Sequence, residues 1–268
     1  MLPTALQLYS VRDFLEKDYE GTIAEVKKMG YDGVEFAGLS GKAPLEVKAL
    51  LEKHGLEPLS AHVSYEDLMK DPVAVLKDYS TVGCKYISIP YLMEEYRPGA
   101  PKYNIFVEDA KMLGAKAKVL GMTLLYHNHD FEFEKVNGRY MLDIIYESVT
   151  ADLLQTQIDT CWVRVAGIDP AEYVRKYTGR APVVHLKDFV KEGEGDKLYD
   201  LIGVEDNRES ASTFEFRPVG QGVQDMPAIV KAAVDAGAKW VVVEQDQPTA
   251  GKSSMQCAME SINYLKTI

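Results

Sequence analysis

Three apolar runs in the second half of the chain each carry a side chain that can bind a metal ion. Asp159 ends LQTQID, His185 lies in APVVHLK and Glu244 ends KWVVVE. Short runs rich in Val, Ile and Leu are typical of buried strands, and a polar residue at such a strand's C-terminal end has no packing reason to be there. In parallel α/β folds ligands bind at that end. Asp, His and Glu that converge there indicate a divalent metal site.

A fourth run, MTLLYHNHDFEF, carries His127, His129 and Glu132. Side chains two apart on a strand share a face, so His127 and His129 point together, and so do His185 and Lys187. A carboxylate or an imidazole can remove a proton next to a carbonyl group, and a nearby ammonium can stabilise the negative charge that results. We therefore predict His127, His129, Lys187 and Glu132 as catalytic residues.

The earlier runs supply candidates for substrate binding. Glu35 ends the second run, His62 lies at the end of the third and Arg12 follows the first. Trp162 follows Asp159 closely, and an aromatic ring there can stack on a ring-shaped ligand, although packing in the core is the commoner role of such a ring. We expect Glu35, His62, Arg12 and Trp162 to contact the substrate.

Strand and helix patterns alternate along the chain. Glycines such as Gly30, Gly55 and Gly83 close helical patterns shortly before a strand, where glycine takes the left-handed conformation that ends a helix. This alternation predicts parallel strands with crossover helices. Eight such units over residues 1–268 indicate one (β/α)8 TIM barrel domain. A doubly wound open sheet is the alternative, which the lack of GxGxxG after the first strand disfavours. The expected strands are 4–9, 32–37, 57–63, 85–90, 122–127, 154–159, 182–187 and 240–245.

The interval between His185 and Glu244 is more than twice as long as that between Asp159 and His185. Its excess, 190–222, is polar and rich in glycine, and we expect an extended loop on the ligand face after strand seven. The loop ends in PVGQG, shortly before a helix that begins near Asp225. Backbone amides of that segment are candidates to hold a substrate hydroxyl or phosphate, and a simple glycine-rich turn is the alternative.

Composition excludes several classes of partner. The chain has 268 residues, with 41 acidic against 30 basic ones and a formal charge of −11. This charge repels a phosphate backbone, so we expect no nucleic acid partner. No apolar stretch is long enough to span a bilayer, and the N-terminus lacks the pattern of a signal peptide. Three cysteines without CxxC spacing indicate reduced thiols and a cytoplasmic location. The oligomeric state stays open, and a homo-oligomer is compatible with the sequence.

Several motifs in order resemble the sugar phosphate isomerase/epimerase family with the xylose isomerase-like TIM barrel. They are LQLYSVRD, YHNHDFEF, QIDTCWVRVAGIDP, HLKDF, PVGQG and VVEQD, between about residues 5 and 260. The resemblance implies one divalent metal held by Glu, Asp, His and Glu from the last four strands. Asp159, His185 and Glu244 match the last three. The first Glu has no match at the tip of the strand, so either Glu132 reaches back or a histidine replaces it, and we favour Glu132.

The resemblance also implies a class of reaction. The metal ion, Mn, Co, Zn or Mg, would hold two oxygens of a sugar or cyclitol, and proton abstraction next to the carbonyl would give an enediolate. Return of the proton makes the protein an isomerase or epimerase, which is our expectation. The alternatives are a lyase, similar to inosose dehydratases or 3-keto-glycoside lyases, and a non-catalytic sugar-binding barrel. Endonucleases of related topology use a three-zinc cluster and a basic surface, which the charge of −11 disfavours.

Overall fold

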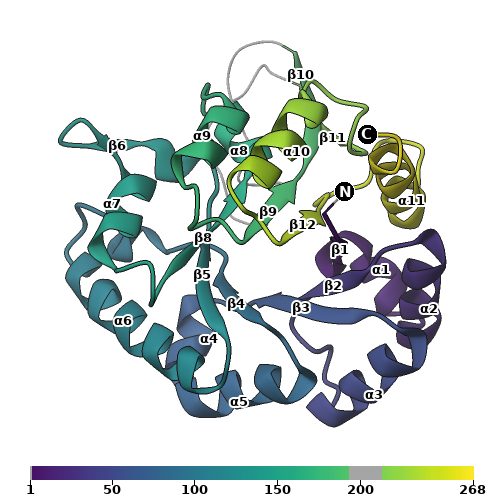
Figure 1. The fold of residues 1–268 in the computed structure, drawn as a ribbon, viewed down its shortest axis with the longest axis horizontal. Helices are drawn as coiled ribbons and strands as arrows, with labels where there is room; N and C mark the ends of the chain where they lie inside the picture. Colours follow the sequence, from purple (N-terminus) through teal and green to yellow (C-terminus); the bar gives the residue numbers. More distant parts are fainter. Residues whose placement is uncertain (1, 193–212) are drawn as a thin grey trace.

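Eight parallel strands close into a barrel in the computed structural model, which describes residues 2–192 and 213–268 (Figure 1). The strands follow the order β1-β12-β9-β8-β5-β4-β3-β2, and β1 pairs with both β2 and β12, so the sheet has no open edge. The predicted TIM barrel is confirmed. The barrel strands are β1 (Thr4–Gln7), β2 (Gly33–Ala37), β3 (Glu57–His62), β4 (Tyr86–Ile89), β5 (Thr123–His127), β8 (Gln155–Asp159), β9 (Val183–Leu186) and β12 (Trp240–Val243).

Helices surround the barrel, and local signals set their ends (Figure 1). Asp18, Asp71 and Asp169 each accept a backbone N–H at a helix start, which satisfies a donor that the helix itself leaves unpaired. Gly30 and Gly83 end their helices in the left-handed conformation. The helices are α1 (Arg12–Leu15), α2 (Tyr19–Met29), α3 (Pro44–His54), α4 (Tyr65–Lys70), α5 (Pro72–Val82), α6 (Tyr103–Val119), α7 (Met141–Ser148), α8 (Thr160–Val165), α9 (Pro170–Lys176), α10 (Met226–Asp235) and α11 (Ser254–Leu265), with short 3-10 turns η1 (Leu8–Val11), η2 (Glu94–Tyr96) and η3 (Phe131–Phe133).

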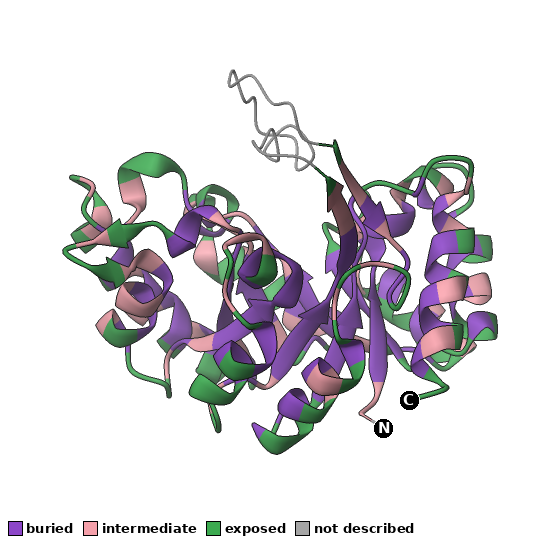
Figure 2. Ribbon diagram, turned by 90° about the horizontal axis from the view of Figure 1, so that it is seen from above, coloured by how far each residue is buried: buried purple, intermediate pink, exposed green. Residues whose placement is uncertain are grey.

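The strands have apolar side chains on both faces, as a sheet covered by helices requires. Figure 2 shows the buried strands at the centre and the exposed surfaces on the outer helices. The larger cluster of buried apolar residues packs strands against helices and includes Leu6, Val184 and Val243. A smaller cluster contains their neighbours in alternation, among them Ala5, Val183 and Val242. Because alternate residues face opposite sides, this smaller cluster fills the inside of the barrel.

The alternation of the strands directs the polar residues of the site. On four strands an inward apolar residue is followed, two positions later, by a polar side chain on the same face. The pairs are Ala5 and Gln7, Leu125 and His127, Val183 and His185, and Val242 and Glu244. The apolar residues of these pairs fill the interior of the barrel below the C-terminal ends of the strands. The polar residues gather at those C-terminal ends. Side chains that were predicted to share a face because they lie two positions apart on a strand therefore do so in the fold.

The segment predicted as an extended loop, 190–222, is in part a β-ribbon. β10 (Asp188–Glu192) pairs with β11 (Thr213–Arg217) in antiparallel register, and residues 193–212 lie outside the described part of the chain. The prediction was wrong for the two ends because Phe189, Phe214 and Phe216 pack together and with Trp162. A second hairpin joins β6 (Lys135–Val136) to β7 (Arg139–Tyr140). Within the described residues, no helix combines the length and the apolar character needed to cross a bilayer.

Candidate active site

A cavity of about 380 Å³ opens at the C-terminal ends of the barrel strands, where the polar residues gather. Its wall combines aromatic side chains with groups that can titrate, as is typical of a site for a small polar molecule. Of the predicted site residues, five line it directly: His62, His127, His129, Lys187 and Glu244. Asp246, which was not among the predicted residues, lines it as well. Asp246 is two positions after Glu244, so the sequence already indicated that the two side chains lie on the same face.

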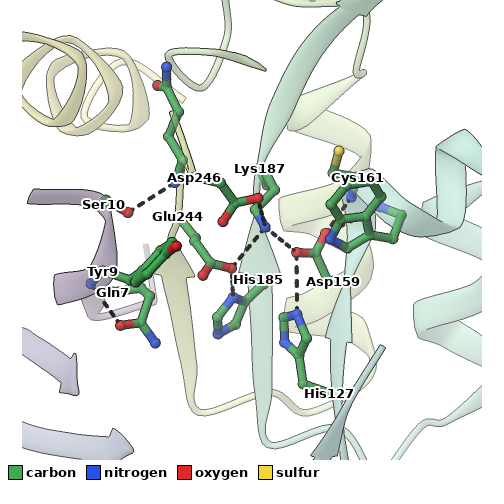
Figure 3. Close-up of polar contacts among 12 residues, drawn as sticks. Gln7, Tyr9, Ser10, His127, Asp159, Cys161, His185, Lys187, Glu244 and Asp246 are labelled. Atoms are coloured by element: carbon green, nitrogen blue, oxygen red, sulfur yellow. Dashed lines mark hydrogen bonds and ion pairs between the residues drawn. The ribbon is translucent and has the colours of Figure 1, made fainter. Parts of the chain in front are cut away.

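Four buried side chains at the floor of this cavity form a ligand cluster: His127, Asp159, His185 and Glu244. One potential ligand atom of each lies within 4.8 Å of the others. Figure 3 shows the four pointing toward one another from neighbouring strands. Three of them, Asp159, His185 and Glu244, were predicted as metal ligands. Two imidazoles and two carboxylates suit Zn, Mn or Co.

Asp159 supports the fit of this cluster to a metal ion. Its Oδ1 accepts the backbone N–H of Cys161 at 2.8 Å and so caps α8. Its buried Oδ2 has no hydrogen-bond partner among the described residues, although Lys187 Nζ lies 3.3 Å and His127 Nε2 3.6 Å away. A buried oxygen that lacks a hydrogen bond is costly unless a cation compensates it. The cluster can therefore hold a metal ion.

Glu132, the favoured fourth ligand, lies outside this cluster. One carboxylate oxygen accepts from the Tyr126 hydroxyl at 2.7 Å and the other from the backbone N–H of His129 at 2.8 Å. The short η3 turn folds the segment back, so the carboxylate binds its own backbone instead of reaching the floor of the cavity. His127 takes the fourth place, the alternative that the sequence left open. Burial raises the pKa of Glu132 to about 7.

Glu35, for which a contact with the substrate was expected, is buried and is not among the residues that line the cavity. Its carboxylate accepts hydrogen bonds from Gln7, at 2.8 Å, and from Gln157, at 2.6 Å, and Ser60 donates a third. The Nε2 atoms of His185 and His62 lie 2.8 and 3.1 Å from its Oε1. We name these six residues the Glu35 network: Gln7, Glu35, Ser60, His62, Gln157 and His185.

Charges in the Glu35 network shift two pKa values in opposite directions. Burial alone would raise the pKa of Glu35, but the positive charges of His62 and His185 outweigh it and lower the pKa to about 2. Burial would likewise lower the pKa of His185, but Glu35 and Glu244 raise it to about 10. Glu35 thus holds Nε2 of His185, which leaves Nδ1, 3.0 Å from Glu244 Oε2, to face the ligand cluster. A carboxylate behind a ligand histidine commonly fixes its orientation in this way.

Lys187 lies among three carboxylates at the wall of the cavity (Figure 3). Its Nζ is 3.0 Å from Glu244 Oε2, 3.0 Å from Asp246 Oδ2 and 3.3 Å from Asp159 Oδ2. Burial alone would lower its pKa, but these carboxylates hold the pKa well above the ordinary value. Lys187 therefore presents a positive charge to the cavity.

Trp162 and Arg12 support the wall and do not line the cavity, in contrast to their predicted role. The indole lies 5.2 Å below Lys187 Nζ and packs against Phe216, so its face is covered by protein. The guanidinium of Arg12 donates to the carbonyl groups of Tyr9, at 2.7 Å, and Asp246, at 2.9 Å. Both side chains fix the backbone or side chains that do line the cavity.

His129 is the histidine of the pair that lies nearer to the rim. Its ring stacks on Phe131 with centroids 5.4 Å apart and meets the edge of Tyr91. Its Nδ1 has no hydrogen-bond partner among the described residues. Burial and the charge of Lys187 lower its pKa to about 3. The imidazole is thus neutral at physiological pH.

The backbone amides of PVGQG are occupied by a side chain of the protein. Asp188 accepts from the N–H groups of Gly220, Gly222 and Gln224 at 2.9–3.2 Å. A side chain at Gly222 would collide with this carboxylate, since an added Cβ would lie 2.1 Å from Asp188 Oδ1. The segment is therefore a tight turn clamped to β10, the alternative that the sequence left open, and these three amides are already bound by Asp188.

A closed parallel barrel with acid–base groups and a ligand cluster at its C-terminal mouth defines a TIM-barrel enzyme. Residues 23–268 match the model of the family described as xylose isomerase-like TIM barrel. The chain belongs to this family, and it is an enzyme of the sugar isomerase/epimerase or lyase type.

Individual relatives span nearly the whole chain. An inosose dehydratase of Clostridium perfringens strain ATCC 13124 is 27% identical over 279 residues, which covers 94% of this chain and 90% of the relative. A sugar phosphate isomerase/epimerase from Parabacteroides distasonis ATCC 8503 has a similar structure, with a TM-score of 0.80 at 22% identity, covering 100% of this chain and 99% of the other. The IolI protein with a bound zinc atom gives a TM-score of 0.73 at 17% identity, covering 100% and 97%.

Proposed function

We propose that the protein is a metal-dependent lyase that removes water from a cyclic polyol ketone. This is the reaction that the name of its relatives, inosose dehydratase, describes. The observation that carries this proposal is the position of His127. Where the resemblance implies a carboxylate, the cluster has an imidazole, and Glu132 is bound to Tyr126 and His129 instead. Epimerisation in this family uses that carboxylate as one of its proton-transfer bases. Its replacement favours elimination over the isomerase or epimerase activity that we expected from the sequence.

His127, Asp159, His185 and Glu244 would hold the metal ion. When bound, the ion would polarise the carbonyl group of the substrate and orient its neighbouring oxygen. Loading the protein with Zn, Mn, Co or Mg in turn would identify the ion. Glu35 would support these four ligands, because its carboxylate lies 2.8 Å from Nε2 of His185 and orients that ring.

His129 is the proposed base. It lines the cavity and its Nδ1 has no hydrogen-bond partner among the described residues, so it would take the proton from the carbon next to the carbonyl group. The electron pair of the broken C–H bond forms the enolate, whose negative charge Lys187 stabilises. The enolate oxygen then re-forms the carbonyl group, the electrons of the enolate C=C bond form a new C=C bond to the neighbouring carbon, and the C–O bond on that carbon breaks. The imidazolium of His129 returns its proton to the departing hydroxyl, so water leaves and His129 is neutral again.

A cytoplasmic location is part of this proposal. The three cysteines, Cys84, Cys161 and Cys257, are buried and free, which suits a reducing compartment.

Purified protein reloaded with Mn²⁺, Co²⁺ or Zn²⁺ tests the function on an inosose in D2O. The expected result is loss of water, followed by the absorbance of the unsaturated or diketone product and by mass spectrometry. His129→Ala should lower turnover by about 100-fold or more. Recovery of a ketose or an epimer that carries deuterium, without loss of water, would instead establish isomerase or epimerase activity. Binding of the sugar with no exchange of any C–H proton would indicate a sugar-binding barrel.

A further inference from the structure

The ammonium group of Lys187 and the proposed metal ion require the same oxygen atoms. Asp159 has only Oδ2 to offer, because Oδ1 caps α8. Glu244 directs Oε2 toward both His185 Nδ1 and Lys187 Nζ. Lys187 lies 3.3 Å from the first of these oxygens and 3.0 Å from the second. Both of the carboxylates in the ligand cluster are thus already paired with a cation of the protein.

Asp246 gives the ammonium a partner outside the cluster. Its Oδ2 lies 3.0 Å from Lys187 Nζ, and it is not part of the four-residue ligand group. Arg12 and the Lys187 ammonium bind opposite parts of this residue, since Arg12 donates to its backbone carbonyl. Asp246 is therefore held in place independently of the cluster.

Carboxylates outnumber the ammonium group at this wall. Asp159, Glu244 and Asp246 surround the single Nζ of Lys187 at 3.3, 3.0 and 3.0 Å. Buried carboxylates without enough cationic partners are costly, so the arrangement favours a metal ion beside the ammonium.

We propose that Lys187 is an internal placeholder cation, which neutralises Asp159 and Glu244 in the metal-free protein and retains Asp246 as its partner when the metal binds. The proposal rests on the metal site of the proposed function. Lys187 weakens metal binding by competing for two ligand oxygens, and Asp246 strengthens binding by drawing the ammonium away. In return, the carboxylates remain paired in the protein without its metal.

Equilibrium binding of Mn²⁺ to the metal-depleted full chain tests this directly, with free Mn²⁺ measured by electron paramagnetic resonance. Lys187→Met should bind Mn²⁺ more tightly by on the order of tenfold, because a competing like charge is removed. Asp246→Asn should bind it several-fold more weakly, and this penalty should shrink in the Lys187→Met background. Lys231→Met, which removes an exposed ammonium paired with Asp235 on α10, is the matched control and should leave the affinity unchanged.

A purely structural role of Lys187 predicts the opposite sign. If the ammonium only holds the ligands in position, Lys187→Met will bind Mn²⁺ more weakly, and that result overturns the proposal, as does an unchanged affinity. Circular dichroism checks folding of each variant, and Lys187→Gln replaces Lys187→Met if the latter does not fold. Absence of Mn²⁺ binding by the wild type overturns the metal site itself. Loss of water from the substrate is measured separately on the wild type, so tighter Mn²⁺ binding by Lys187→Met together with a wild type that releases no water supports the placeholder and rejects only the proposed reaction.

Discussion

Two buried carboxylates near the mouth of the barrel have opposite electrostatic surroundings. Glu35 and Glu132 are both fully buried. Glu35 contacts two histidines and accepts from three polar side chains, and its pKa is lowered to about 2. Among the described residues, Glu132 accepts from the Tyr126 hydroxyl and the His129 amide, and its pKa is raised to about 7. The number and the charge of the donors, and not burial alone, decide whether a buried carboxylate keeps its charge.

The two carboxylates support different residues of the site. The charge of Glu35 is transmitted to His185, a member of the ligand cluster. Glu132 contacts no member of that cluster with its carboxylate and instead shapes the turn that presents His129 to the cavity. The first carboxylate therefore supports a ligand and the second supports a proposed base.

The largest expected effect is on stability. Glu35→Ala removes the partner of two histidines and three polar groups, and loss of one side of a buried ionic network should lower the free energy of unfolding by about 3–5 kcal/mol. Glu132→Ala leaves one hydroxyl and one amide without an acceptor and should cost about 1–3 kcal/mol. Urea unfolding of both variants without metal at pH 8, followed by circular dichroism, gives the two values. A larger loss for Glu132→Ala would contradict the comparison.

The pH dependence of stability should distinguish the two carboxylates next. The pKa of Glu132 is about 7 in the folded chain, above its value in the unfolded chain. Its protonated form therefore stabilises the fold fully below about pH 4.5, and this contribution is lost as the pH rises through 7. Relative to Glu132→Gln, the wild type should lose about 3 kcal/mol of unfolding free energy between pH 4.5 and pH 8. Urea titrations at several pH values measure the difference, and parallel curves for the two proteins would refute the raised pKa.

For Glu35 the sign is reversed. Its pKa is lowered to about 2 in the folded protein, so its contribution is present at neutral pH and is lost as the pH falls below its unfolded value toward 2. The stability of the wild type relative to Glu35→Gln should therefore decrease on acidification, over a window that does not overlap that of Glu132.

Much of the barrel and three of the four cluster residues could be predicted from the sequence. Strand alternation is a local property, so Val183 and His185, or Val242 and Glu244, share a face wherever the strand lies. A polar residue two positions beyond an inward apolar residue is a signal that one sequence can reveal. The same reasoning placed His127 and His129 at the mouth of the barrel.

Contacts beyond the strand ends could not be predicted in this way. Glu132 was favoured as a ligand because of its type, whereas the η3 turn decides where its carboxylate points. Glu35 has the parity of a site residue, yet partners from β1, β3, β8 and β9 enclose it. Asp188 has the opposite strand parity to Lys187, and its carboxylate clamps the PVGQG turn. The contacts of Glu35 and Asp188 depend on partners distant in the sequence, and those of Glu132 depend on the conformation of a local turn.

Substitutions of Glu35 and Glu132 should also differ in their effect on metal affinity. This difference should be smaller than the difference in their effect on stability. Glu35→Gln keeps the size of the side chain but removes the charge beside His185 Nε2. Loss of such a partner behind a ligand should weaken Mn²⁺ binding by about 10–100-fold. Glu132→Gln is the matched variant and should change the affinity little, because Glu132 lies outside the ligand cluster. Equal losses in both variants would show that Glu132 takes part in binding the metal.

Tyr126→Phe should give the smallest effect and isolates one hydrogen bond of Glu132. The hydroxyl lies 2.7 Å from the carboxylate, and its removal should cost about 1 kcal/mol near pH 5, where Glu132 is protonated. The cost should rise to about 2 kcal/mol at pH 8, because a hydrogen bond to an ionised carboxylate is stronger than one to its neutral form. The same removal should raise the pKa of Glu132 further. Urea unfolding of Tyr126→Phe and Tyr126→Phe/Glu132→Gln at both pH values tests this, since the pH dependence should vanish in the double variant if Glu132 is its source.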